Sequence, residues 1–274
     1  MKNFKNSCAV ITGSASGLGR GLALVLAERG MNIVAADWDA DGVERTARDA
    51  KAFGVKAIAV HTDVSNYAAV QALADKSYDT FGSVQLLMNN AAVTDRRPLW
   101  ETPAEDWQWM LSINVEGVAH GITAFVPRML QQTGERHVAI TSSTNGLWIM
   151  PGQGTYNTTK YALIGLSEAL DDDLAPHGIK VSVICPGPMN TEMGFRSKPP
   201  SRGGAPAMTE MPDIQELREM FAVWKMQEPK DAALNVVRGL EDEEFYIFTH
   251  AAGWDKIEQR HQRMAAAFKR RTAW

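Results

Sequence analysis

The chain has 274 residues, of which 45% are hydrophobic, and its formal net charge at pH 7 is −4. This length fits one large α/β domain or two small ones, and the apolar fraction can supply a full core. The balanced charge excludes a strongly basic surface, so we expect neither nucleic acid nor an anionic membrane as a partner.

The two cysteines, Cys8 and Cys185, each lie in an apolar run that is typical of a buried strand. We therefore expect reduced thiols in a cytoplasmic protein rather than a disulfide framework. Residues 1–7 are too short and polar for a signal peptide, and no apolar run approaches the ~20 residues that span a bilayer. The histidines show no metal-ligand spacing, so we expect no metal.

The first predicted unit is a strand at residues 8–11, which runs into a glycine-rich turn at residues 12–19. Apolar residues at helical spacing predict a helix at residues 20–29, which Gly30 ends. Such a turn lets the backbone approach a pyrophosphate, and the helix N-terminus offers free N–H groups to the phosphates. We predict a dinucleotide site rather than a purely structural turn. Its predicted contacts are Gly13, Ser16, Gly17, Leu18 and Gly19.

The second predicted strand, at residues 32–36, ends at Asp37. An acidic residue at this position accepts hydrogen bonds from the adenosine ribose and repels an added 2′-phosphate. The turn holds no lysine or arginine to compensate, and Arg20 is assigned to the helix surface. NAD is therefore favoured over NADP.

Helices predicted at residues 40–53 and 66–81 alternate with strands at residues 56–60 and 84–88. This alternation predicts a single domain with a parallel, doubly wound α/β sheet and right-handed crossovers.

Ligands of such sheets lie beyond the carboxyl ends of the strands. Gly13, Asp37, Asp63 and Asn90 all fall at such ends. Asp63 either faces the adenine side of a nucleotide crevice or is a plain turn aspartate, and the sequence leaves both open. The cofactor contacts predicted in this region are Asp63, Val64, Asn90 and Ala91.

A long helical segment at residues 105–127 has an expected break near Asn114. Asn114 lies among apolar residues, so its amide is expected to be buried and to need hydrogen-bond partners. The amide either joins two elements or serves a proton relay and orients a lysine. A local kink allows both.

A fifth strand, at residues 137–140, leads into Ser142 and Ser143. A hydroxyl at this strand end lies near the nicotinamide end of the cofactor and can donate to a substrate oxygen as charge builds on it. Strand alternation places the two serines on opposite faces. Ser143 is preferred, and Ser142 is its rival.

The helix predicted at residues 156–175 begins with Tyr156 and Lys160, which share one helix face. A nearby ammonium stabilises a phenolate and lowers the phenol pKa from its usual ~10. Tyr156 can then exchange a proton with an alcohol or a ketone near neutral pH. The pair alone fits a half-buried tyrosine with a solvated lysine, and the motifs around it favour catalysis.

The sixth strand, at residues 179–184, ends in a sharp turn at residues 185–191. Thr191 in this turn is placed to hydrogen-bond a nicotinamide carboxamide. The cofactor contacts predicted here are Pro186, Gly187 and Thr191.

In order and spacing, these motifs resemble the short-chain dehydrogenase/reductase family over about residues 5–195. The matching residues are Thr12-Gly-x₃-Gly-x-Gly19, Asp63, Asn89-Asn-Ala91, Asn114, Ser143, Tyr156-x₃-Lys160 and Pro186-Gly187. Ala92 departs from the glycine that the family usually has. The resemblance implies a Rossmann fold with a seven-stranded sheet, and hydride transfer to or from nicotinamide C4. A less specific similarity links the whole chain to bacterial aromatic-alcohol Cα-dehydrogenases.

The resemblance also implies a catalytic tetrad. In it Tyr156 is the general acid/base, and Ser143 polarises the substrate oxygen. Lys160 lowers the tyrosine pKa and holds the nicotinamide ribose, while Asn114 anchors a water relay to Lys160. The helices at residues 114–128 and 156–174 would form the interface of a homodimer or homotetramer.

Residues 189–226 interrupt the strand–helix rhythm with prolines, methionines and aromatics, and the resemblance makes them a flap over the substrate. These side chains suit a hydrophobic or aromatic alcohol or ketone, or else they pack the flap onto the core or another subunit. Trp100, Trp107 and Trp109 are expected to pack near the subunit interface. The predicted substrate-pocket residues are Trp148, Met150, Met189, Met193, Phe195 and Trp224.

A last strand at residues 245–248 and a C-terminal helix and tail at residues 252–274 complete the chain. The sequence thus predicts an NAD-dependent oxidoreductase that interconverts a secondary alcohol and a ketone. An NADPH-dependent carbonyl reductase is the alternative enzyme, and Asp37 argues against it. A catalytically silent nicotinamide-sensing or scaffold protein is the alternative from another class, and the complete tetrad argues against it.

Overall fold

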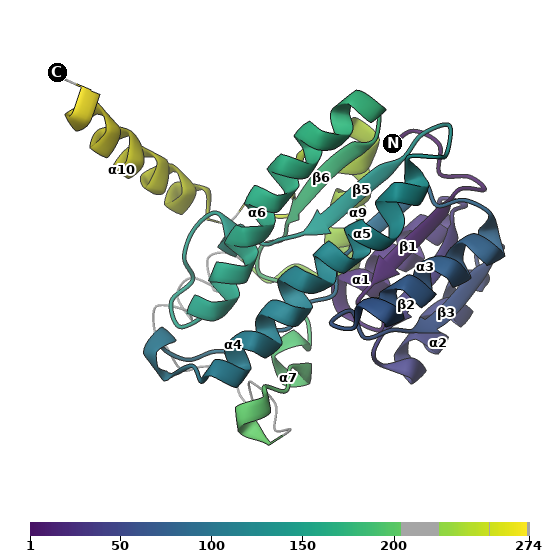
Figure 1. Cartoon of the computed structure of the whole chain (residues 1–274), viewed down its shortest axis with the longest axis horizontal. Helices are drawn as coiled ribbons and strands as arrows, with labels where there is room; N and C mark the ends of the chain where they lie inside the picture. Colours follow the sequence, from purple (N-terminus) through teal and green to yellow (C-terminus); the bar gives the residue numbers. More distant parts are fainter. Residues whose placement is uncertain (204–224, 252, 273–274) are drawn as a thin grey trace.

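The computed structural model describes residues 1–203, 225–251 and 253–272. A seven-stranded sheet of order β3-β2-β1-β4-β5-β6-β7 forms its centre (Figure 1). Every pair of neighbouring strands is parallel, which confirms the predicted doubly wound fold. The strands are β1 (Cys8–Thr12), β2 (Asn32–Asp37), β3 (Ala57–His61), β4 (Leu86–Asn89), β5 (His137–Thr141), β6 (Lys180–Cys185) and β7 (Tyr246–Phe248).

Helices cover both faces of the sheet, and strand alternation divides the core between them. Ala9 and Ile11 of β1 pack on one side, while Cys8 and Val10 pack on the other. Strands buried on both faces read as continuous apolar runs, which is why β1 is recognisable in the sequence. The first side carries α1 (Gly17–Glu28), α2 (Ala40–Lys51) and α9 (Pro229–Asp242). The second carries α3 (Tyr67–Phe81), α5 (Gly117–Met129) and α6 (Gly154–Leu174).

Shorter elements connect this framework. The predicted break near Asn114 is a π-helical segment, η2 (Ser112–Glu116), between α4 (Ala104–Leu111) and α5. Single turns are η1 (Leu99–Glu101), η3 (Thr144–Gly146), η4 (Ala175–His177) and η5 (Pro200–Arg202), and α7 (Met193–Arg196) precedes η5.

Helix α9 has no counterpart among the elements predicted from the sequence. Its signals are Pro229 in the first turn and an apolar stripe facing α1. The helix ends at Asp242, and Glu243 then adopts a left-handed conformation with φ of 58°. The stripe comprises Ala232, Ala233, Val236, Val237 and Leu240.

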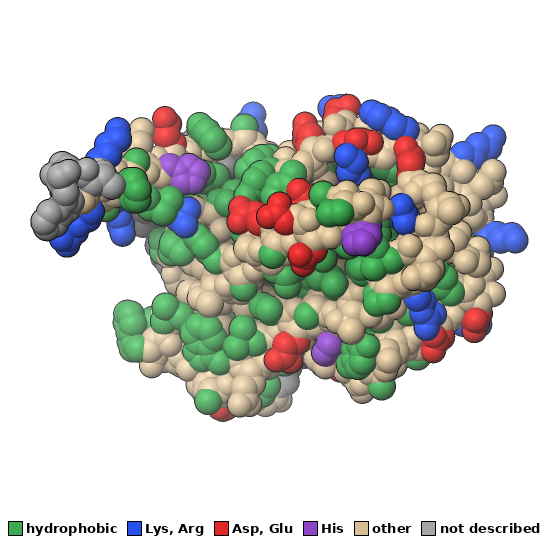
Figure 2. Space-filling model, turned by 45° about the horizontal axis from the view of Figure 1, so that its top comes forward, with side chains coloured by type: hydrophobic (Ala, Val, Ile, Leu, Met, Phe, Trp, Pro, Cys, Tyr) green, Lys and Arg blue, Asp and Glu red, His purple; other side chains and the backbone are tan. Residues whose placement is uncertain are grey.

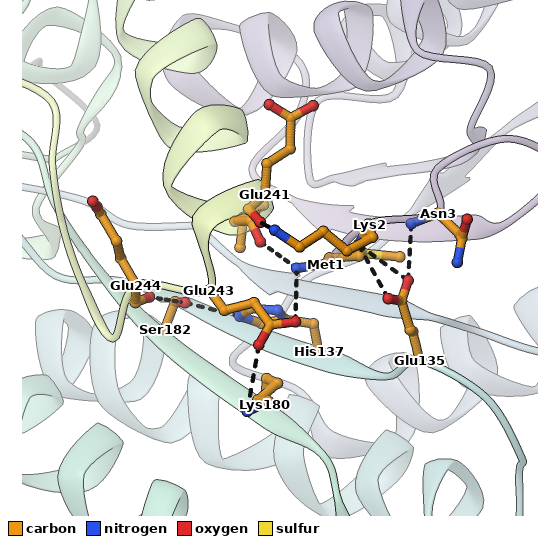
Figure 3. Close-up of polar contacts among 11 residues, drawn as sticks. Met1, Lys2, Asn3, Glu135, His137, Lys180, Ser182, Glu241, Glu243 and Glu244 are labelled. Atoms are coloured by element: carbon orange, nitrogen blue, oxygen red, sulfur yellow. Dashed lines mark hydrogen bonds and ion pairs between the residues drawn. The ribbon is translucent and has the colours of Figure 1, made fainter.

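The amino-terminal edge of the sheet is fastened by the first residues of the chain (Figure 3). The Met1 ammonium donates to the carbonyl of Leu240. The Glu135 carboxylate accepts from the main-chain N–H groups of Lys2 and Asn3, at 3.1 and 2.8 Å. These contacts lie at the edge opposite the carboxyl ends of the strands, where a ligand is expected.

A buried histidine belongs to the same edge (Figure 3). Ser182 Oγ donates its one proton to the carbonyl of Glu244. His137 Nε2 lies 2.8 Å from Ser182 Oγ and is therefore the donor in the hydrogen bond between these two side chains. Burial lowers the pKa of His137 to about 3, with smaller contributions from the chain's N-terminal ammonium and Lys180. His137 is therefore neutral at physiological pH.

The last helix, α10 (Trp254–Thr272), projects away from the sheet and its helical layers (Figure 1). Near its start, Ile257 joins a small cluster with Trp148 and Met150, and the Arg260 guanidinium lies 5.1 Å from the centre of the Tyr161 ring. Hydrophobic side chains are visible on this arm in Figure 2, where acidic and basic groups are interspersed over the rest of the face. Within the described residues, no helix combines the length and the apolar character needed to cross a membrane.

Candidate functional site

A cavity of about 640 Å³ opens at the carboxyl ends of the strands. It extends past the ends of β1 and β4, where the chain order of the sheet reverses and α/β folds bind their ligands. Every cofactor contact predicted from the sequence lines this cavity. These residues are Gly13, Ser16, Gly17, Leu18, Gly19, Asp37, Asp63, Val64, Asn90, Ala91, Tyr156, Lys160, Pro186, Gly187 and Thr191.

The glycine-rich turn has a geometry that only glycines allow. Gly13 and Gly17 have φ of +68° and +52°. A Cβ on Gly19 would lie 2.1 Å from the carbonyl oxygen of Gly13. Ser16, the residue before α1, makes no side-chain capping bond to the first turn. The turn therefore leaves main-chain N–H groups at the helix N-terminus for an anion, which fits the pyrophosphate of a dinucleotide.

Asp37 at the end of β2 is 9% exposed and lines the cavity. Its two carboxylate oxygens accept from the N–H groups of Ala15 and Asp39, each at 3.0 Å. Burial raises the pKa of Asp37, and these two bonds oppose the increase. The carboxylate thus fixes the glycine-rich turn to β2 as well as facing the cavity.

Arg196 reaches the same end of the cavity from α7, and sequence reasoning did not identify it. Its guanidinium pairs with Asp39, whose other oxygen accepts from Gly42 N at 3.0 Å and caps α2. The hydrogen bond with Arg196 is the main reason that the Asp39 pKa is low. The two partners are 157 residues apart, so no local signal could have revealed this contact.

Asp63 is a turn aspartate that also lines the cavity, and its position on the adenine side of a nucleotide stays a prediction. Its Oδ1 accepts from Ser65 N at 2.9 Å and Ser65 Oγ at 2.7 Å, as a turn aspartate does.

Asn90 joins three strand ends. Its Nδ2 donates to the carbonyls of Thr12 and Gly13 at 3.0 and 3.3 Å, and its Oδ1 accepts from Thr141 Oγ1 at 3.2 Å. Ala92, the departure from the family pattern, keeps a negative φ and fits without strain.

Asn114 is fully buried in η2 and its amide is satisfied by protein groups. Oδ1 accepts from Val93 N at 2.8 Å, and Nδ2 donates to Val93 O at 2.9 Å and Thr159 Oγ1 at 3.0 Å. The side chain therefore joins the loop after β4 to α6, as one of the two readings expected. Its role in a proton relay stays a prediction.

The two serines after β5 point to different partners, as strand alternation predicts. Ser142 Oγ donates to the carbonyl of Lys160 at 2.8 Å and is used within the fold. Ser143 Oγ makes a longer bond of 3.4 Å to the carbonyl of Pro186, and it hydrogen-bonds Tyr156. Ser143 is therefore better placed than Ser142 to turn toward a ligand beside Tyr156.

The expected lowering of the Tyr156 pKa is wrong for this structure. Burial raises the pKa of the Tyr156 phenol to about 12, and only its hydrogen bond with Ser143 opposes this. Lys160 Nζ lies 5.4 Å from the centre of the Tyr156 ring and donates to the carbonyl of Thr141 at 2.9 Å. Burial lowers the pKa of Lys160 to about 7, so the lysine is a weaker cation than the sequence argument assumed.

Met150, Met189 and Met193 line the cavity as predicted for the substrate end. Trp148 does not line it; the indole is 6% exposed and packs against Ile257 of α10 instead. Trp224 and the side chain of Phe195 lie outside the described part of the chain.

Other cavity residues were assigned elsewhere or not identified from the sequence. Trp109 was expected to pack near a subunit interface, yet it lines the cavity, and Trp100 is 86% exposed. The unidentified lining residues at the substrate end include Val93, Thr94, Arg96, Ile113, Asn145, Gln153 and Met226.

The first part of the predicted flap is tied to the loop after β4 and to α4. Ser197 Oγ accepts from Thr94 N at 2.9 Å. Ser201 N donates to Asp106 Oδ1 at 2.9 Å, and its hydroxyl donates to the other oxygen at 2.5 Å. Asp106, which is fully buried, also pairs with Arg97 at 3.0 Å. The flap therefore begins as a fixed wall of the cavity.

The described residues contain no group of three or more His, Cys, Asp or Glu side chains that could hold a metal ion. The cavity brings together the hydroxyls of Ser143 and Tyr156, the ammonium of Lys160 and the glycine-rich turn.

Comparison with known proteins identifies this arrangement. The family model described as short chain dehydrogenase matches residues 7–200. A short-chain dehydrogenase/reductase from Burkholderia phymatum, crystallised with NAD, is 36% identical with a TM-score of 0.85, over 97% of both chains. A C alpha-dehydrogenase from Sphingobium is 30% identical over 96% of this chain and 86% of its own length. A CLA biosynthesis dehydrogenase/reductase from Lactiplantibacillus plantarum is also 30% identical, over 96% of this chain and 95% of its own length.

Proposed function

Because the chain belongs to the short-chain dehydrogenase family, we propose that it is an NAD-dependent enzyme that interconverts a secondary alcohol and a ketone. The observation that carries this proposal is one cavity lined by the glycine-rich turn at one end and by Ser143, Tyr156 and Lys160. A dinucleotide and a small alcohol can share such a cavity.

NAD would lie with its pyrophosphate on the turn from Gly13 to Gly19 and its adenosine ribose near Asp37. The free N–H groups before α1 and the buried carboxylate support this orientation. Lys160 uses one of its three protons on Thr141, which leaves two for the hydroxyls of the nicotinamide ribose. Bound NAD⁺ supplies the hydride acceptor for the substrate carbon.

The protein side of the reaction is a proton transfer at Tyr156. In alcohol oxidation, the phenolate oxygen of Tyr156 takes the hydroxyl proton of the substrate as the carbon loses hydride. Ser143 Oγ leaves its weak bond to Pro186 and donates to the substrate oxygen. In ketone reduction, the same phenol returns the proton to the oxygen. Asn114 in η2 fixes the position of α6, which carries Tyr156, through its hydrogen bond to Thr159.

The test is a panel of secondary alcohols, from small aliphatic to bulky benzylic, assayed with NAD⁺ on the wild type and on Tyr156→Phe. We expect Tyr156→Phe to lower kcat by about 10²–10⁴-fold, the range for a positioned acid or base. NADH binding, followed by fluorescence, should change less than threefold. Substantial turnover by Tyr156→Phe with a good substrate would exclude this catalytic assignment. Binding of NADH without turnover of any alcohol would favour the sensing or scaffold protein.

The NADPH-dependent carbonyl reductase is the second candidate, and Arg196 is the observation in its favour. An arginine beside Asp39 brings a positive charge to the adenosine end of the cavity. The charge is already paired with Asp39, and Asp37 faces the same space, so NAD remains our proposal. Titration with NADH and NADPH under identical conditions decides between the two cofactors.

We also propose a homodimer or homotetramer built on α5 and α6, in a reducing compartment such as the cytoplasm. The buried free thiols of Cys8 and Cys185 support the compartment. Size-exclusion chromatography with light scattering measures the assembly, and a monomeric mass at assay concentration would exclude it.

A further inference from the structure

Arg96 is a positive side chain in the cavity that neither the tetrad nor the proposed NAD orientation uses. It lies in the loop after β4, and its Nη2 donates to the carbonyl of Pro151 at 3.3 Å, a long bond. Its Nε lies 3.5 Å from where a Cβ on Gly152 would be. Residues 151–152 lie just before α6, which carries Tyr156, and Arg96 and Tyr156 line the same cavity.

The charge of Arg96 has no counterion in the described part of the chain, in contrast to that of its neighbour. Arg97 lies 2.5 Å from the Asp95 carboxylate and 3.0 Å from that of Asp106. No described carboxylate forms an ion pair with Arg96, and burial is the one cause that lowers the Arg96 pKa. The two adjacent arginines thus differ. Arg97 forms ion pairs within the protein, whereas Arg96 lines the cavity and forms no ion pair with a described carboxylate.

The groups around Arg96 are suited to an amphipathic ligand. Asn145 Nδ2 donates to Gln153 Oε1 at 3.0 Å, and Gln153 Nε2 faces Thr94 Oγ1 at 3.5 Å, so polar groups border the arginine. The apolar part of the same end is formed by Trp109, Ile113, Met150 and Met193. The partly exposed guanidinium of Arg96 beside these apolar walls can offer N–H groups to a ligand that carries a negative charge.

On the basis of the proposed function, we propose that the substrate is a hydrophobic secondary alcohol or ketone that carries a carboxylate, and that Arg96 binds this carboxylate. The apolar walls hold the carbon skeleton, and Tyr156 and Ser143 meet the hydroxyl or carbonyl. Arg96 then anchors the other end of the molecule. A guanidinium binds a carboxylate with two parallel N–H···O bonds, which also fixes the orientation of the substrate.

Matched probes test this assignment. 4-Acetylbenzoate, its methyl ester and acetophenone differ at the ring position para to the ketone, and 7-oxooctanoate with 2-octanone forms an aliphatic pair. Their dissociation constants for the enzyme with NADH are measured by calorimetry, and kcat/KM is measured for the corresponding alcohols with NAD⁺. We expect at least one carboxylate to be preferred over its neutral partner by about tenfold or more.

Two variants separate specific recognition from general attraction. Arg96→Met should remove the preference for the carboxylate and leave the affinity for the neutral ketone within about threefold, while Arg96→Lys should keep part of the preference. Lys198→Met removes a positive charge from the exposed rim of the cavity and should change the preference less than twofold. Equal losses in Arg96→Met and Lys198→Met would overturn the proposal, as would weaker NADH binding in Arg96→Met with unchanged discrimination.

The outcomes for the reaction and for Arg96 are distinct. If neutral alcohols are oxidised in a Tyr156-dependent manner and no carboxylate is preferred, the proposed reaction is supported and carboxylate binding by Arg96 is excluded. If the carboxylate ketones bind in an Arg96-dependent manner and no alcohol is oxidised, the anchoring role stands and the proposed reaction falls.

Discussion

Lys160 donates through Nζ to the main-chain carbonyl of Thr141 at 2.9 Å, while the same nitrogen lies 5.4 Å from the centre of the Tyr156 ring. The lysine thereby joins the end of β5, just before Ser142 and Ser143, to the helix that carries the tyrosine. Its burial lowers the pKa of Lys160 to about 7, and burial raises that of Tyr156 to about 12. The protein alone therefore keeps the Tyr156 phenol neutral near pH 7, where Lys160 is about half protonated.

The first prediction concerns the pH dependence of the two reaction directions. Oxidation needs the Tyr156 phenolate, and with a pKa of about 12 this form becomes more abundant as pH rises. We expect kcat/KM for alcohol oxidation to increase from pH 7 to pH 10 by up to about tenfold per unit, and that for ketone reduction not to increase. Initial rates in constant-ionic-strength buffers measure both. An oxidation rate that is independent of pH over this range would contradict the assignment of Tyr156 as the base.

The second prediction concerns cofactor choice. Asp37→Asn keeps an oxygen acceptor for one of the two N–H partners and removes the negative charge. We expect the dissociation constant of NADPH to fall about tenfold relative to that of NADH. The reason is that repulsion between two charges about 4 Å apart near a protein surface is about 1–4 kcal/mol, and the variant removes it. Asp79→Asn, an exposed carboxylate on α3 outside the cavity lining, is the comparison variant and should not change the ratio. An unchanged NADH/NADPH ratio in Asp37→Asn would show that another group sets the preference.

The third prediction concerns the glycine-rich turn. Gly19→Ala places a methyl group 2.1 Å from the carbonyl of Gly13, so the turn must open. We expect NADH affinity to fall by at least about tenfold, because the N–H groups lose their alignment on the phosphates. Gly165→Ala, in α6 with nothing within 4 Å of the added methyl, is the matched control and should leave NADH affinity unchanged. Equal affinity in Gly19→Ala and the wild type would place the pyrophosphate elsewhere.

The fourth prediction concerns acid stability and His137. The folded-state pKa is about 3 against an ordinary 6.5, so the unfolded chain binds the extra proton first as pH falls. The stability contributed by neutral His137 is therefore complete above pH 6.5 and is lost progressively toward pH 3, with a slope of at most about 1.4 kcal/mol per pH unit.

Urea denaturation between pH 7.5 and pH 4.5 measures this slope. His137→Gln keeps a side-chain donor for Ser182 and cannot gain the proton, so its stability should fall less steeply over the same range. Parallel curves for His137→Gln and the wild type would mean that other groups govern acid unfolding.

Local patterns predicted the parts of the site that depend on local geometry. The run from Cys8 to Gly19 specifies a buried strand, a tight turn and a helix start within twelve residues, and the structure has all three in place. The break near Asn114 was predicted as well, together with a buried amide that needs hydrogen-bond partners.

Contacts between segments that are far apart in the chain were not predicted from the sequence. Arg196 of α7 pairs with Asp39 at the start of α2, and Trp109 of α4 lines the cavity, because the paths of the flap and of α4 determine both positions. The direction of the Tyr156 pKa was mistaken for a related reason. Helical spacing gives the proximity of Lys160, whereas desolvation depends on every element that covers the phenol.

The ties of Ser197 to Thr94 and of Ser201 to Asp106 have a consequence for how this enzyme can acquire new substrates. The wall that starts the flap and the loop that carries Arg96 are fastened to each other, so a change of shape in one is transmitted to the other. Adaptation to a new substrate should therefore proceed through paired substitutions on the two segments. Libraries that randomise residues 93–97 together with residues 193–201 should yield altered preferences more often than libraries that randomise either segment alone.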